Sequence, residues 1–304
     1  MTNDSAFPAI TPEMARDRFI VNDASSTERF KADFNQFIIA PLQYSRPVIK
    51  LPLPPSRTSN HVLVLVTGGQ VEMTIGHQAY SLADHELVIV PALQIFTINA
   101  IREDSQGFLC FFSQELVFRA VGDTDFDFLK LTNNPHVTLS DQQLDFIGAV
   151  LHRLTVEYTE NGSANTDLIR PYLSALLAEV NRVYAGTVRP KIDAGDGLVQ
   201  RFMDLLTTQI RQTRLVSQYA DWLTISPNHL NKVIKGRTGK SPSVWIDERI
   251  VLEAKVLLFQ SGLSIAQIAH ELGFEDQSTF GKLFRKYAQV SPTDFRNRYA
   301  GTND

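Results

Sequence analysis

Hydrophobic and polar residues follow two different patterns along the chain, and the pattern changes near residue 135. From Phe34 to Phe112, apolar runs of strand length, such as HVLVLVT and ELVIV, are separated by turn residues. The dipeptides Gly68-Gly69 and Gly76-His77 stand between such runs, as expected for tight hairpin turns. Short strands at regular spacing, without a helical pattern between them, predict an antiparallel β-barrel or jelly roll over residues 31–135.

After Pro135 the apolar period lengthens to that of a helix. Two such stretches predict two helices within residues 136–186, which are candidates for dimerisation. Residues 187–196 mix proline, glycine and charge, as expected of an interdomain linker, and the polar residues 1–30 are expected to form an N-terminal arm. Residues 197–304 are helical in period throughout. The prediction is a two-domain α+β protein, with an antiparallel β-barrel followed by helices and then an all-α domain.

The C-terminal part contains one sequence pattern twice. Ala220 and Leu223 recur as the same residue types 49 residues later, whereas Leu230, Lys232 and Ser241-Pro242 have counterparts 50 residues later. Each copy has the pattern of a helix, a tight turn and a second helix, and small alanines allow the two helices to cross closely. The repeat therefore predicts two helix-turn-helix units.

Local signals mark where these helices begin and end. Ser226-Pro227 is an N-cap followed by proline at the first helical position, and Ser264 with Gln267 forms a capping box. Gly273 fits a helix stop in the second turn.

Between the two units, Ser241-Pro242 begins a predicted linker helix that runs to about Gln260. At ~1.5 Å per residue this helix is roughly 28 Å long, close to one ~34 Å turn of DNA. Two recognition helices on such a spacer can enter successive major grooves on one face of a duplex.

The second helix of each unit leaves polar residues on its outward face once Leu230, Ile234, Phe280 and Phe284 face the core. Asn and Gln can pair with adenine, whereas Lys and Arg bind guanine or phosphate. Phosphates accept most protein–DNA hydrogen bonds, so Lys235, Arg285 and Lys286 are expected to contact phosphates. For any single residue a solvated helix face is the alternative. The predicted DNA-binding residues are Asn228, Asn231, Lys232, Lys235, Gln277, Ser278, Lys282, Arg285 and Lys286. Gly281, on the same face, weakens its helix.

These residues resemble the double helix-turn-helix domain of AraC/XylS-type transcriptional regulators. The resemblance is carried by Ser226-Pro227, the turn Gly239-Lys240-Ser241-Pro242, Arg249, Gly273-Phe274 and Ser291-Pro292. It implies that Asn228, Asn231 and Lys232 contact bases or phosphates from the first unit, and Gln277, Ser278 and Lys282 from the second. One departure is Gln289, where many members have glycine. This substitution costs little if the backbone avoids positive φ at this position.

The N-terminal half is similar in layout to the cupin-like barrel and two helices of the same family. The resemblance implies a sequence-specific transcriptional regulator, expected as an activator, controlled by a small effector or by dimerisation. The sequence itself does not decide between activation and repression. Its implied partners are double-stranded promoter DNA, a small-molecule effector, a second copy of the chain and RNA polymerase. A regulator controlled only by contact with another protein stays open as an alternative.

Composition and charge narrow the function further. The chain has 304 residues, of which 43% are hydrophobic and 20% charged, which excludes a disordered chain. No apolar run approaches the ~18 residues of a membrane span, and no secretory signal is visible, so we expect a cytoplasmic protein without a membrane partner. Cys110 is the only cysteine, which excludes an intrachain disulfide and a cysteine zinc site. From residue 197 onward, 14 Lys and Arg face 10 Asp and Glu, a basic bias within a chain of net charge −4.

Enzyme chemistry is the competing hypothesis. A cupin-type metal-dependent enzyme with a helical appendage would need paired metal ligands, but His61, His77 and His85 lack the His-x-His spacing. The string GRTGKS is no phosphate loop, because Ile234 stands where the motif requires glycine. We therefore expect no catalytic residue, metal or cofactor. Tyr44, Phe96 and Phe111 are candidates for an effector pocket, although inward aromatic residues usually fill a small barrel and the ligand-binding residues stay unknown.

Overall fold

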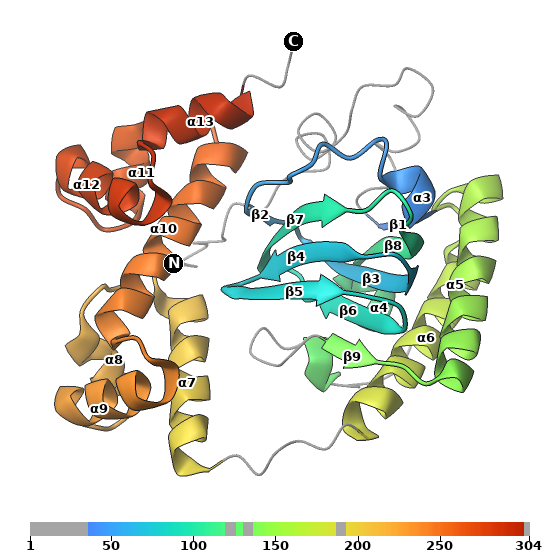
Figure 1. Cartoon of the computed structure of the whole chain (residues 1–304), viewed down its shortest axis with the longest axis horizontal. Helices are drawn as coiled ribbons and strands as arrows, with labels where there is room; N and C mark the ends of the chain where they lie inside the picture. Colours follow the sequence, from blue (N-terminus) through green and yellow to red (C-terminus); the bar gives the residue numbers. More distant parts are fainter. Residues whose placement is uncertain (1–35, 119–125, 130–135, 187–192, 301–304) are drawn as a thin grey trace. The chain divides into compact units, whose positions relative to one another are not determined.

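The computed structural model describes residues 36–118, 126–129, 136–186 and 193–300, which belong to two compact units divided between residues 188 and 189 (Figure 1). The predicted arm, residues 1–30, and residues 187–192 of the predicted linker lie outside the described residues.

The N-terminal unit contains two antiparallel sheets. The first has the order β1 (Phe37–Pro41), β8 (Gln106–Ser113), β3 (Asn60–Gly68), β6 (Glu86–Val90) and β9 (His136–Thr138). The second has the order β2 (Ser56–Arg57), β7 (Ile95–Ile101), β4 (Val71–Ile75) and β5 (Gln78–Leu82). The predicted hairpin turn at Gly76-His77 is confirmed, because β4 pairs with β5 and Gly76 has φ of +60°. The predicted hairpin at Gly68-Gly69 is wrong. Gly69 does have φ of +74°, but β3 and β4 belong to different sheets and do not pair, so this turn carries the chain from one sheet to the other.

The antiparallel, jelly-roll-like architecture is confirmed, although the sheets are not closed into a barrel. In the described part of the chain no strand ladder joins one sheet to the other. The hydrophobic pattern of a strand fixes which face is buried, but not whether its sheet closes, because closure depends on pairing between strands distant in sequence. β9 adds a short strand at the beginning of the segment for which only helices were predicted.

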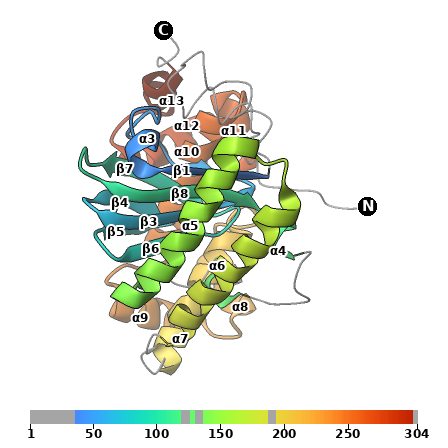
Figure 2. The same ribbon diagram turned by 90° about the vertical axis from the view of Figure 1, so that its right-hand side faces the viewer.

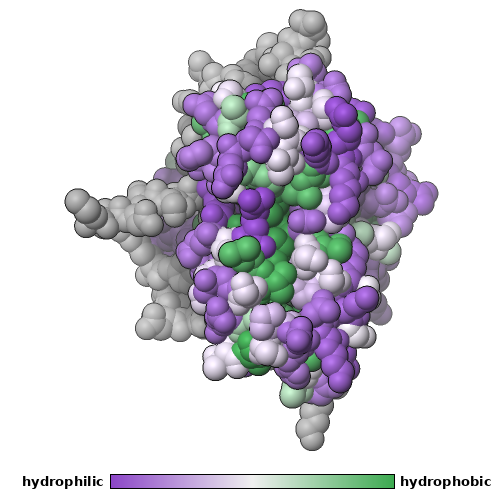
Figure 3. Space-filling model, turned by 90° about the vertical axis from the view of Figure 1, so that its left-hand side faces the viewer, coloured by the Kyte–Doolittle hydropathy of each residue, from purple (hydrophilic) through white to green (hydrophobic). Residues whose placement is uncertain are grey.

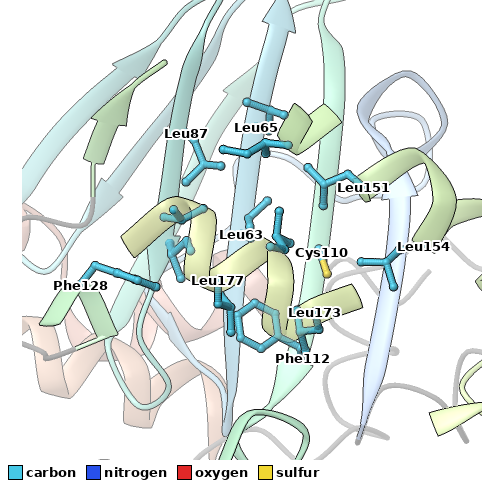
Figure 4. Close-up of a cluster of buried hydrophobic side chains, with 14 of the residues drawn as sticks. Leu63, Leu65, Leu87, Cys110, Phe112, Phe128, Leu151, Leu154, Leu173 and Leu177 are labelled. Atoms are coloured by element: carbon cyan, nitrogen blue, oxygen red, sulfur yellow. The ribbon is translucent and has the colours of Figure 1, made fainter. Parts of the chain in front are cut away.

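The main core of this unit lies between the five-stranded sheet and two long helices, α5 (Asp141–Asn161) and α6 (Thr166–Gly186). Figure 2 shows both helices crossing this face of the sheet. Leu63 and Leu65 of β3 pack in the same cluster as Leu151 and Leu173 (Figure 4). Side chains alternate along a strand, so Val62, Val64 and Val66, which are equally buried, face the other way. β3 is therefore the buried centre of the unit.

Shorter elements complete this unit. They are α3 (Leu42–Ser45), α4 (Gln114–Phe118) and a 3₁₀ turn over Asp127–Leu129. α5 begins with a capping box between Ser140 and Gln143. The corner between α5 and α6 is fixed by the buried carboxylate of Glu157, which accepts hydrogen bonds from the amides of Asn161 at 2.8 Å and Asn165 at 3.0 Å.

The C-terminal unit is all-helical and repeats itself as predicted. Its helices are α7 (Ala194–Gln209), α8 (Val216–Trp222), α9 (Pro227–Thr238), α10 (Pro242–Gln260), α11 (Ile265–Glu271), α12 (Gln277–Ala288) and α13 (Pro292–Ala300). α8 and α11 have 7 residues each, and α9 and α12 have 12 residues each. Their starts are 49 and 50 residues apart, so the repeat in sequence is a repeat in structure.

Every predicted cap in this unit is confirmed. The Ser226 hydroxyl accepts from the backbone N–H of His229 at 3.2 Å, and Pro227 occupies the first turn of α9. Ser264 and Gln267 form the capping box of α11. The predicted linker helix is α10, which begins at Pro242 after the Ser241 cap and ends at Gln260.

Each repeat needs two residues in the left-handed backbone region, one in the turn and one after its second helix. In the turns these are Thr224, with φ of +58°, and Gly273, with φ of +77°. After the second helices they are Gly239, with φ of +77°, and Gln289, with φ of +60°. The expectation that Gln289 costs little was conditional on negative φ, and the structure shows that this condition fails. Local sequence does not reveal the φ that helix packing imposes.

Replacing Gln289 by glycine is therefore expected to stabilise the C-terminal unit. A non-glycine residue in the left-handed region costs about 1–2 kcal/mol, part of which the hydrogen bond from Gln289 Nε2 to the Lys286 carbonyl offsets. The expected gain is about 0.5–1 kcal/mol in urea unfolding. Both tryptophans, Trp222 and Trp245, lie in this unit, so their fluorescence reports its unfolding. The reciprocal change, Gly239→Gln, should lower stability, and a neutral Gln289→Gly would contradict this account.

Candidate nucleic-acid interface

α9 presents its four predicted DNA-binding residues to solvent. Leu230 and Ile234 are both fully buried and fix the rotation of the helix against the core. Asn228, Asn231, Lys232 and Lys235 are exposed on the remaining surface. In an α-helix, residues three or four apart share a face, so 228, 231, 232 and 235 form one continuous stripe.

α12 has the same construction. Phe280 and Phe284 are fully buried, and their rings lie 5.9 Å apart in the core. Its five predicted residues, Gln277, Ser278, Lys282, Arg285 and Lys286, are all exposed. The structure thus places all nine sequence-predicted residues on the surfaces of the two second helices.

A groove of about 580 Å³ follows the exposed side of α12. Residues of α12, the first residue of α11 and the beginning of α13 line it. Gly281 belongs to this lining, and a Cβ added to it would find no atom within 4 Å. The sequence showed Gly281 as a weak point of the helix, but not that its missing side chain leaves open space beside Lys282 and Arg285.

The basic residues differ in how far carboxylates neutralise them. Lys286 Nζ lies 4.0 Å from a carboxylate oxygen of Asp247 on α10, which also accepts a hydrogen bond from the Tyr287 hydroxyl at 3.0 Å. At the end of α9, Arg237 is paired with Asp193 and lies 3.5 Å from Asp196. The charge of Lys286, a predicted contact, is therefore partly compensated by a carboxylate, which spacing alone does not reveal.

Near the groove, Asp294 balances part of the positive charge. The hydrogen bond from the Ser291 hydroxyl holds the pKa of Asp294 below its usual value, and the charges of Arg285 and Arg298 act in the same direction. Asp294 is thus ionised at neutral pH and offsets part of the field of Arg285.

A buried ionic cluster fixes α10 relative to the end of α7. The Glu253 carboxylate is completely buried and lies 3.0 Å from the guanidinium of Arg249 and 4.0 Å from that of Arg211. A second contact joins the two repeats, because the Arg214 guanidinium lies 4.0 Å above the ring of Phe274. These contacts connect α10 with the segment after α7, and the segment before α8 with the turn of the second repeat.

The surface of this unit suits a polar ligand. α9 and α12 lie at the left-hand edge of Figure 1, and Figure 3 shows this side facing the viewer. Most of its side chains are hydrophilic, and they surround a smaller central strip of hydrophobic ones. Among the described residues of this unit, the exposed large hydrophobic side chains are Leu215 and Trp222.

His61 and His85, which were considered as metal ligands, contact other protein groups. His61 is buried, its Nδ1 accepts from the Ala92 N–H at 2.9 Å, and burial lowers its pKa to about 4. His85 contacts Asp84 and Asp141. Over the ranges that the structure describes, no group of three or more His, Cys, Asp or Glu residues could hold a metal ion.

One effector-pocket candidate was wrong. Tyr44 is 70% exposed on α3, because the segment after β1 forms a short helix instead of continuing as an inward-facing strand. Phe96 is buried and Phe111 half-buried, so both belong to the packed sheets. None of the described helices is long and apolar enough to cross a membrane.

The C-terminal unit is similar to known helix-turn-helix proteins. Residues 219–298 match the family model described as "Helix-turn-helix domain". The lactose operon transcription activator of Staphylococcus xylosus is 24% identical over 144 residues, covering 47% of this chain and 52% of that protein. The arabinose operon regulatory protein of Escherichia coli K12 is 30% identical over 81 residues, 27% of this chain and 28% of that protein. The chain thus matches about half or less of the length of these relatives.

A solved structure aligns over more of the chain at lower identity. It is the unsaturated-fatty-acid-bound ToxT of Vibrio cholerae, which is 14% identical over 88% of this chain and 98% of its own, with a TM-score of 0.43.

Proposed function

The C-terminal domain is of the AraC/XylS type, and from this premise we propose that the chain is a sequence-specific, DNA-binding transcriptional regulator. The observation that carries the proposal is the duplicated exposed stripe on α9 and α12, joined by the single helix α10. At ~1.5 Å per residue, the 19 residues of α10 span about 28 Å, roughly 6 Å less than the ~34 Å between successive major grooves, and the flanking turns add to this length.

Lys232 and Lys282 provide the direct test, because they occupy the same position in the two repeats and are both exposed. Changing both to alanine should weaken binding to every duplex and lower the slope of log affinity against log salt by about 2, one for each lost phosphate contact. The matched control is Arg102→Ala with Arg182→Ala, which removes the same charge from the N-terminal unit and should leave the slope nearly unchanged. Unchanged DNA binding in the lysine variant would contradict the assignment of α9 and α12 as the DNA-contacting helices.

We assign regulation to the N-terminal unit. Phe146 is 58% exposed, and Val156 and Tyr172 are exposed on the same pair of helices, which supports homodimerisation through α5 and α6. The proposed regulator is a cytoplasmic activator that responds to a small effector and acts on RNA polymerase at a promoter. The named relatives are an operon activator and an operon regulatory protein, and we assign no catalytic step to either unit.

A further inference from the structure

The two repeats agree at their basic positions and differ at their amide positions. In the 50-residue register, Lys232 corresponds to Lys282 and Lys235 to Arg285, so both cations are present twice. The outward residues that precede these cations are not kept, because Asn228 corresponds to Ser278 and Asn231 to Gly281. The two helices therefore carry similar charge but unequal capacity to recognise bases.

Asn228 and Asn231 equip α9 for base recognition. An asparagine amide can pair with adenine through two hydrogen bonds, and residues three apart project from the same face. Both are exposed, and Asn228 belongs to the first turn of α9, the end that reaches base edges in helix-turn-helix proteins.

α12 has a different surface at the equivalent positions. Ser278 is short, and Gly281 has no side chain, so the middle of the helix is hollowed into the 580 Å³ groove. Lys282 and Arg285 line this hollow, and Gln277 is the one amide in the lining from the first half of α12. A hollow flanked by cations fits a chain of phosphates, which Lys, Arg and Gln side chains all contact in protein–DNA complexes.

We propose that the two helix-turn-helix repeats have different roles in DNA binding. α9 recognises base sequence through Asn228 and Asn231. α12 binds a DNA backbone strand in the groove at Gly281 and discriminates little between bases. This inference rests on the proposed function and deepens it. It makes Gly281 a positioning residue, since its missing side chain admits the backbone and makes no contact of its own.

Gly281→Ala tests the groove without endangering the fold. The added Cβ enters open space and removes a helix-weakening glycine, so the Tm of the C-terminal unit should rise. Binding should nevertheless weaken about tenfold, equally for unrelated and selected duplexes, because the methyl group obstructs the backbone. Gly148→Ala in α5, where a Cβ also meets nothing within 4 Å, should raise stability without weakening DNA binding. Tight binding by Gly281→Ala would overturn the proposal.

Asn231→Ala and Gln277→Ala test the division itself. Asn231→Ala should weaken binding to a selected site by about 5- to 100-fold and leave an unrelated duplex unaffected, as expected for a base contact. Gln277→Ala should weaken both duplexes alike. Loss of discrimination in Gln277→Ala equal to that in Asn231→Ala would refute the division while leaving DNA binding intact. If the wild-type chain binds no duplex at low salt, the proposed function itself fails.

Discussion

Replacing Glu253 by alanine is expected to destabilise the C-terminal unit by about 3–5 kcal/mol. The carboxylate is completely buried between Arg249 and Arg211, whose side chains are themselves 9% and 18% exposed. Removing it takes a buried anionic partner away from two guanidinium groups in a low-dielectric environment. The cost then includes their desolvation, which exceeds the value of the ion pair itself.

Tryptophan fluorescence during urea unfolding measures this effect selectively, because Trp222 and Trp245 both belong to the C-terminal unit. The control is Arg237→Ala, which breaks an exposed pair with Asp193 in the same unit and should cost less than about 1 kcal/mol. If Glu253→Ala is no more destabilising than this control, the cluster does not hold α10 in place.

Gly107→Ala is expected to have a comparably large effect on the other unit. Gly107 has φ of +132°, and a Cβ there would lie 1.9 Å from the carbonyl oxygen of Leu65 on the adjacent strand. The clash involves backbone atoms of β3, the buried centre of the sheet, which cannot move without disturbing pairs on both sides. The expected loss is about 3 kcal/mol or more.

Circular dichroism and fluorescence together locate this loss. The N-terminal unit has no tryptophan, so Gly107→Ala should shift a dichroism transition and leave the fluorescence transition in place. Gly68→Ala is the matched control near the same strand pair, because its Cβ would meet only the Gln106 side chain at 3.7 Å or more. It should cost about 1 kcal/mol or less. Equal losses in the two variants would contradict the role of the close approach at Gly107.

The C-terminal unit was predictable almost to the residue because its signals are local. Ser241-Pro242 and the Ser264–Gln267 capping box satisfy backbone groups within one turn, so the sequence alone fixes where these helices begin. The apolar spacing that buries Phe280 and Phe284 also decides which residues face outward. The sequence therefore predicts which residues of α9 and α12 are exposed at the candidate site.

What the sequence could not predict depends on distant parts of the chain. Whether two sheets close into a barrel is decided by pairings between remote strands, and the three-residue strand β9 carries too weak a pattern to be recognised. Gln289 adopts the left-handed conformation where α12 ends, before α13 packs against it. The proximity of Lys286 to Asp247, 39 positions earlier in the chain, likewise depends on the tertiary structure.

Selection of binding sites from random duplex DNA by the purified full chain tests the central claim most directly. Two helix-turn-helix units on a rigid spacer should enrich a site with two blocks about one ~10 bp turn apart, the α9 block more sharply defined than the α12 block. Recovery of an unenriched pool from a folded protein, or of two blocks at a spacing other than about one turn, would contradict bipartite DNA recognition by this chain.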